Sequence, residues 1–150
     1  MEIKDLTKKA ILIGIYFILI NINPIGFGMI QFRIGEAMSV IPFCNRKYVG
    51  TFILAAGLAN IFSPLGIIDI GVGISCAAIT YAISKYVKNK HINAAIFSLI
   101  SGLFVGLALY YTSGLNFFIS FISISLSQLI ITNVGVYIFS LKQLQEIIMD

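Results

Sequence analysis

Three charged side chains stand out because the residues around them are apolar. Arg33 and Glu36 lie in the segment QFRIGE, and Asp69 lies in the segment GIIDIG. On a helix, residues three positions apart share a face, so Arg33 and Glu36 would point the same way. They form either a structural ion pair or part of a polar ligand site. Asp69 either caps the N-terminus of a helix, where its charge suits the helix dipole, or belongs to that site.

Neutral polar residues in other apolar segments are candidates to line the same site. They are Asn60, Ser101 and Gln128. Asparagine and glutamine amides also form hydrogen bonds between packed helices with no ligand present. Both interpretations stay open for these residues.

Motifs of the common enzyme classes are missing from the sequence. It contains one histidine, His91 in a basic segment, and no HExxH, GxSxG, paired-aspartate or phosphate-loop motif. Cys44 and Cys76 lie in apolar runs without metal-ligand spacing, so we interpret them as small buried hydrophobic side chains. We therefore expect neither catalysis nor a bound metal or cofactor.

The composition is that of an integral membrane protein. Hydrophobic residues make up 59% of the 150 residues and charged residues 11%, whereas about a quarter of the residues of a soluble domain are charged. Turn or charge signals divide the sequence into six apolar segments, at about 10–30, 34–44, 48–62, 67–84, 92–111 and 115–140. The sequence therefore predicts an all-α fold, a single domain over residues 1–150 built as a bundle of six transmembrane helices. No signal-peptide cleavage site follows the first apolar segment, so we expect that segment to be retained.

Basic residues predict the topology. Nine of the ten Lys and Arg residues fall on one side of the membrane if the chain crosses it six times. The positive-inside rule then places both termini in the cytoplasm, in a multi-pass protein of the cell membrane. The same residues lie in small clusters and not along one polar face, so nucleic acid is not the expected partner.

The second and third apolar segments are shorter than the ~20 residues that a perpendicular crossing needs. Non-helical backbone is tolerated at membrane depth where protein or a cavity satisfies its polar groups. We expect such backbone in the first external loop, within residues 21–31, which contain Pro24, Gly26 and Gly28.

Pairs of small residues four positions apart allow two helices to approach closely. The pairs are Ala10 with Gly14, Ala55 with Ala59, and Gly102 with Gly106. For most such pairs the expected role is packing within the bundle.

Several of these segments together resemble the QueT family. The stretch IQFRIGEA at 30–37, followed by VIPF at 40–43, resembles the QFRISEALTVLPFF-type motif of that family. The stretches LANIFS at 58–63, GIIDI at 66–70 and VGLALYY at 105–111 resemble further family segments at similar spacing. The resemblance spans most of the chain.

The resemblance implies the substrate-binding S component of an energy-coupling factor (ECF) transporter. Such a component is a six-helix protein that docks on a transmembrane coupling subunit carrying two ABC-type ATPases. Ala10 and Gly14 match the coupling-subunit contact on the first helix. The implied substrates are queuosine precursors, 7-deazaguanines such as preQ1 or queuine, captured from outside the cell.

The implied substrate suggests a role for each polar residue of the motif. Glu36 would accept the adjacent N–H groups of a guanine-like edge, and Arg33 would donate to its carbonyl. Phe32 would stack on the ring, and Asp69 would meet an ammonium group. Gln31, in the same motif, would also contact the substrate.

The chain departs from the family pattern at Ser101, Ala108 and Gln128, where the family has Asn, Glu and Glu. The loss of acidic groups suggests another deazapurine, a nucleoside or a different micronutrient. An accessory membrane protein, or a channel or facilitator that works without an ATPase, is the alternative from another functional class.

Overall fold

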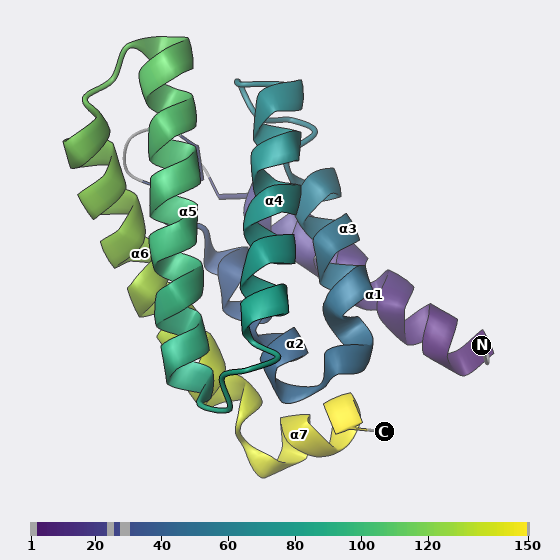
Figure 1. The fold of residues 1–150 in the computed structure, drawn as a ribbon. Coiled ribbons are helices and arrows are strands. Elements are labelled where there is room, and N and C mark those ends of the chain that lie inside the picture. The colour runs from purple at the N-terminus through teal and green to yellow at the C-terminus, as the bar shows by residue number, and fades with distance from the viewer. Residues whose placement is uncertain (1–2, 24–25, 28–30, 150) are drawn as a thin grey trace.

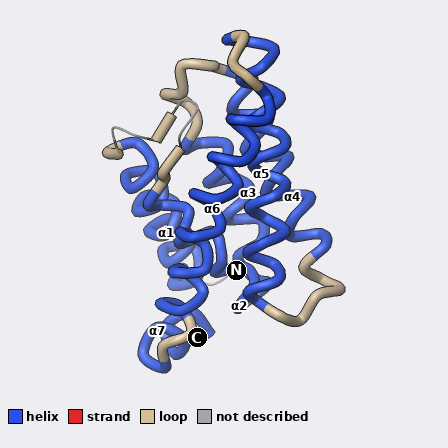
Figure 2. Tube along the Cα trace, turned by 90° about the vertical axis from the view of Figure 1, so that its left-hand side faces the viewer, coloured by secondary structure: helices blue, strands red, loops and turns tan. Residues whose placement is uncertain are grey.

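The computed structural model describes residues 3–23, 26–27 and 31–149, and within these ranges every regular element is a helix (Figures 1 and 2). The predicted all-α class is therefore confirmed for the described residues. The α-helices are α1 (Ile3–Asn21), α2 (Ile41–Cys44), α3 (Val49–Ala59), α4 (Ile67–Ile83), α5 (Lys90–Ser113), α6 (Phe117–Phe139) and α7 (Lys142–Met149). Two 3-10 helices, η1 (Ile34–Val40) and η2 (Arg46–Tyr48), lie on either side of α2.

The helices form one bundle in which α5 and α6 pair along their length, and α4 lies between α5 and α3 (Figure 1). The 3-10 helix η1 packs between α1 and α6. Its contact with α6 is close, because a Cβ added to Gly135 of α6 would lie 2.9 Å from the Cα of Ala37. This placement carries the residues before and within η1 into the middle of the bundle.

Local sequence sets the ends of the two long helices. The side chain of Asn89 accepts hydrogen bonds from the backbone N–H groups of His91 and Ile92 in α5, and that of Asn116 accepts one from Ile119 in α6. Gly114 ends α5 in the left-handed conformation (φ 66°), which a residue without a Cβ adopts at little cost.

Among the residues that the structure describes, two helices, α5 and α6, are long and apolar enough to cross a membrane. Ile34–Cys44 and Ile67–Ile83 are apolar but shorter. The six crossings expected from hydropathy therefore stay a prediction.

One end of the bundle gathers the start of α1, the end of α4 and the end of α7 around residues 45–47. Asp5 lies 4.0 Å from the ammonium group of Lys47, and the side chain of Asn45 donates to the carbonyl of Ile148 at 2.9 Å. Arg46 donates to the carbonyl of Tyr81 near the end of α4. A six-crossing topology requires both chain ends to lie at this end of the bundle, beside the basic residues 46 and 47.

Asp5 is also paired within α1. The Lys9 ammonium donates to its carboxylate at 2.7 Å and, with Lys47 nearby, holds the pKa of Asp5 below its ordinary value.

The helix α1 ends at Asn21, although the first apolar segment continues to about residue 30. The stretch predicted to be irregular, residues 21–31, therefore begins at the end of α1. The described residues between α1 and η1 are outside any helix, and Gly26, Gln31 and Arg33 among them are buried. Pro24 and Gly28 lie outside the described residues. Irregular backbone thus enters the interior of the bundle, where protein groups bond to it.

The small-residue pairs have different environments. Ala55 and Ala59 are in the core, and a Cβ on Gly102 would lie 2.9 Å from the carbonyl oxygen of Phe121 in α6. By contrast, a Cβ on Gly14 would meet nothing within 4 Å.

The last helix, α7, was not predicted from the sequence. Residues 142–149 combine four polar residues with Leu144, Ile147, Ile148 and Met149, and the helix places Ile148 in the core. Its apolar content is too low for a hydropathy search, but the spacing of its apolar residues is typical of an amphipathic helix.

Candidate functional site

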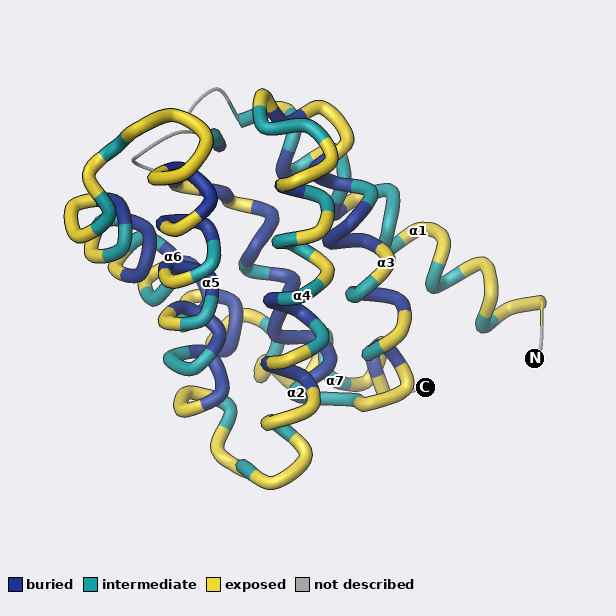
Figure 3. Tube along the Cα trace, turned by 45° about the horizontal axis from the view of Figure 1, so that its top comes forward, coloured by how far each residue is buried: buried dark blue, intermediate teal, exposed yellow. Residues whose placement is uncertain are grey.

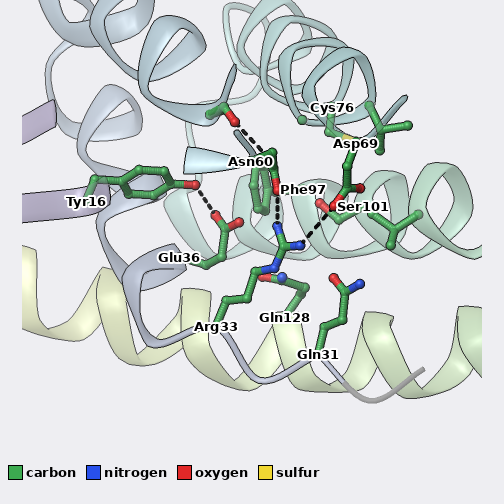
Figure 4. Close-up of a pocket in the computed structure, with 14 residues that line it drawn as sticks. Tyr16, Gln31, Arg33, Glu36, Asn60, Asp69, Cys76, Phe97, Ser101 and Gln128 are labelled. Carbon is green, nitrogen blue, oxygen red and sulfur yellow. Dashed lines mark hydrogen bonds and ion pairs between the residues drawn. The ribbon is translucent and has the colours of Figure 1, made fainter. Parts of the chain in front are cut away.

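One cavity lies in the middle of the bundle, between η1, α1, α3, α4, α5 and α6 (Figure 4). We call it the inner cavity, and it is lined by Tyr16, Gln31, Arg33, Glu36, Ala56, Asn60, Asp69, Val72, Gly73, Cys76, Phe97, Ser101, Val105 and Gln128. The space in it that water molecules can occupy is about 30 Å³, enough for one or two waters. Seven of the eight residues that the sequence suggested for substrate binding are in this lining.

Arg33 is at the centre of the polar network (Figure 4). Its Nε donates to the carbonyl of Gly26 at 2.6 Å, Nη1 donates to Oδ1 of Asn60 at 3.0 Å, and Nη2 lies 3.5 Å from Oδ2 of Asp69. The guanidinium also lies over the ring of Phe27, 4.7 Å from its centre. A buried guanidinium needs such partners, because an unpaired charge in the interior is strongly destabilising.

Of the two alternatives that the sequence left open for Arg33 and Glu36, the structural ion pair between them is not found in the part of the chain that the structure describes. Arg33 precedes η1 as its N-cap residue with an extended backbone (φ −95°, ψ 98°), so the rule for residues three apart on one helix does not apply. Within the described residues, no ion pair within 4.0 Å joins Arg33 and Glu36, and the acidic partner of Arg33 is Asp69.

Glu36 instead accepts a hydrogen bond from the hydroxyl of Tyr16 at 2.9 Å. The residue is 6% exposed. A carboxylate can accept about four hydrogen bonds, so the Tyr16 bond leaves most of its capacity open.

Asp69 lies in the first turn of α4, where its charge suits the helix dipole, but it does not cap the helix. The N-cap residue is Gly66, which has a positive φ of 59°. The Asp69 carboxylate accepts from the hydroxyl of Ser63 at 2.5 Å and from Arg33. Asp69 therefore joins the start of α4 to the polar network.

Two glutamine side chains bring unpartnered acceptors to the inner cavity. The Oε1 atoms of Gln31 and Gln128 have no hydrogen-bond partner in the part of the chain that the structure describes, and each residue is 2% exposed. Ser101, at 5% exposed, lies in the same lining. Because buried polar atoms are nearly always bonded, these oxygens indicate a place where a ligand or water donates hydrogen bonds.

Phe32 is the predicted site residue that the structure leaves outside the inner cavity. It is 40% exposed, whereas its neighbours Gln31 and Arg33 are buried. In extended backbone, successive side chains point to opposite sides, so this segment cannot direct all three inward. The aromatic rings that do line the inner cavity belong to Tyr16 and Phe97.

Other lining residues carried no signal in the sequence. Tyr16 and Phe97 are aromatic residues within apolar helices, and Cys76 was interpreted only as a buried hydrophobic side chain, which at 4% exposed it is. Gly73 has a spatial role, because a Cβ there would lie 2.5 Å from Nδ2 of Asn60. Its lack of a side chain lets α4 approach the amide that bonds to Arg33.

The predicted coupling-subunit contact lies away from this site. Ala10 is exposed and Gly14 half-buried on α1, whose N-terminal half extends from the bundle with an accessible surface (Figure 3). The large apolar side chains of Ile11 and Ile15, 55% and 44% exposed, are on the same helix.

Comparison with curated proteins finds no match, and neither does comparison with solved structures. A family model described as "QueT transporter" matches residues 6–143, nearly the whole chain. The match includes every residue of the inner cavity. The chain therefore belongs to the QueT transporter family.

Proposed function

We propose that this chain is the substrate-binding S component of an ECF-type importer, and that it binds a 7-deazaguanine queuosine precursor in the inner cavity. The observation that carries the proposal is the set of acceptors at this cavity. Gln31 and Glu36 come from one segment and Gln128 comes from α6, and each presents an oxygen with spare hydrogen-bonding capacity. A transporter family supplies the context for a small-molecule ligand there.

A guanine-like edge suits this arrangement. Its adjacent N–H groups would donate to the Glu36 carboxylate, and its carbonyl would accept from Arg33, in the way that arginine reads guanine O6 in other settings. Arg33 has five N–H groups, of which three have partners among the described residues. Phe97, in place of Phe32, would contact the ring.

The charges of the site favour Glu36 over Asp69 as the main acceptor for the ligand. The Asp69 carboxylate already bonds to Arg33 and Ser63, whereas Glu36 has the single Tyr16 donor. A cationic group on the ligand would therefore compete with Arg33 if it approached Asp69. This differs from the role that the family resemblance suggested for Asp69.

The inner cavity is too small for the proposed ligand, because about 30 Å³ of space cannot hold a bicyclic base. Ligand entry would therefore require the Arg33 side chain to give up part of its network. The ligand's carbonyl would then replace one of the acceptors that Arg33 loses.

Calorimetric titration of the purified protein with preQ1 and with queuine tests the binding site. Glu36→Gln removes a charged acceptor worth about 1.5–3 kcal/mol, so we expect the Kd to rise about 10- to 150-fold. Glu146→Gln on the exposed surface of α7 is the matched control and should leave the Kd unchanged. Equal affinity in the wild type and Glu36→Gln would contradict the role of Glu36.

The coupling partners are proposed from the family and from the accessible face of α1. A transmembrane coupling subunit and two ABC-type ATPases would dock at Ala10 and Gly14 and drive uptake across the cell membrane. Gly14→Trp should reduce co-purification of the coupling subunit, whereas Gly71→Trp on α4, which also has open space above its Cα, should not. Substrate uptake in cells that lack these ATPases would contradict the S-component proposal and favour a facilitator.

A different micronutrient is the second candidate, and the departures from the family pattern favour it. Gln128, where the family has Glu, and Ser101, where it has Asn, line the inner cavity, while Ala108, at the other acidic position, does not line it. Native mass spectrometry of the purified protein would separate the candidates by the mass of any retained ligand.

A further inference from the structure

A second cavity adjoins the inner one, and we call it the outer chamber. It lies at the end of the bundle opposite residues 45–47, beneath the turns that join α3 to α4 and α5 to α6 (Figure 1). Its volume is about 160 Å³. Gln31 and Asp69 line both cavities, so the two cavities adjoin at these two residues.

The wall of the outer chamber is mainly apolar. Its apolar side chains are Phe27, Pro64, Leu65, Leu109 and Leu115. Leu109 is 3% exposed and belongs to a core cluster against which Leu65 and Leu115 pack. Core packing therefore holds these three leucines of the wall in place.

The volume of the outer chamber fits one small ring. An apolar cavity of about 150 Å³ accommodates benzene, and the outer chamber is of similar volume. An ammonium group alone would lose its hydration against these apolar side chains. Asp69, the carboxylate in the lining, already accepts from Arg33 and Ser63.

The polar residues of the outer chamber are Ser63 and Ser113, together with Gln31 and Asp69 where the two cavities meet. The unpartnered Oε1 of Gln31 and the carboxylate of Asp69 are both acceptors there. Hydroxyl groups on a ring in the outer chamber would reach these acceptors, while the apolar face of the ring would contact the leucines.

We propose that the outer chamber is a second ligand subsite, which takes a hydroxylated five-membered ring carried by the base. The inference rests on the proposed function, because the base itself occupies the inner cavity. It predicts that the protein prefers a 7-deazaguanine bearing a cyclopentenediol or similar ring over one bearing a bare aminomethyl group.

The experiment compares queuine, which carries such a ring, with preQ1, which does not, by calorimetric titration. The wild type should bind queuine at least tenfold more tightly. Leu115→Phe and Leu65→Phe narrow the outer chamber at two half-buried positions. Each should lower the affinity for queuine at least tenfold and change that for preQ1 by less than twofold.

Leu107→Phe is the matched control, since Leu107 is on α5 but lines neither cavity. It should leave both affinities unchanged. If the wild type binds preQ1 and queuine equally and the two filling variants affect neither or both alike, the subsite is refuted while the proposed function stands. If the wild type binds neither compound, the proposed substrate and the subsite both fail.

Discussion

The ion pair between Arg33 and Asp69 can be tested by removing either charge. The two side chains are 5% and 2% exposed, and Nη2 lies 3.5 Å from Oδ2. At an effective dielectric constant of about 20, two unit charges at that separation attract by about 5 kcal/mol, most of which offsets the cost of burying them. Removal of one partner from a buried pair typically costs about 3–5 kcal/mol, because the other charge is left uncompensated.

We expect Asp69→Asn to lower the free energy of unfolding by about 3 kcal/mol. The lower end of the range applies because Asn60 and the carbonyl of Gly26 still accept from Arg33. Arg33→Met should cost a similar amount, and the double variant should cost at least 2 kcal/mol less than the sum of the two.

The assay is SDS-induced unfolding in detergent micelles, followed by the loss of helical circular dichroism. A second cycle that combines Arg33→Met with Glu36→Gln is the control, and its coupling should be smaller, since Glu36 bonds to Tyr16. The reasoning is refuted if the Arg33 and Asp69 variants add within 0.5 kcal/mol, the usual limit for independent sites, or if the Glu36 cycle gives the larger coupling.

Two further stability predictions use the same unfolding assay. Gly135→Ala would push a methyl group to 2.9 Å from the Cα of Ala37, so it should cost about 1–3 kcal/mol, whereas Gly71→Ala, with open space, should cost nothing; equal effects would contradict the close packing of η1 on α6. Tyr16→Phe removes the hydrogen bond to the buried Glu36 carboxylate and should cost about 1.5–3 kcal/mol, and an unchanged midpoint would show that the bond contributes nothing.

The sequence was sufficient to assign polar side chains to one site, because the burial of a polar side chain is costly. Arg33, Asn60, Asp69 and Gln128 are unusual in apolar segments, and cost alone predicts that they gather around a partner or a cavity. The structure brings them together. Which of them bond to each other was not predictable, because pairing depends on backbone geometry.

The segment before η1 shows this dependence. A helical periodicity would have placed Arg33 beside Glu36, but extended backbone directs Gln31 and Arg33 inward and Phe32 outward. Tyr16 and Phe97 were missed for the opposite reason. Aromatic residues are ordinary in apolar helices, so their sequence gives no sign that they face a polar cavity.

The Arg33 network also has a consequence for biosynthesis. Asp69 is 36 residues later in the chain than Arg33, and Asn60 is 27 residues later, whereas Tyr16 precedes Glu36 by 20. When residue 36 has been synthesised, Glu36 therefore has its donor, whereas Arg33 has the carbonyl of Gly26 but still lacks Asn60 and Asp69. An arginine at membrane depth costs ~2.5–3.5 kcal/mol on insertion scales. In the six-crossing topology that the sequence predicts, the segment around Arg33 would gain a stable position only after the ribosome has delivered α3 and the start of α4.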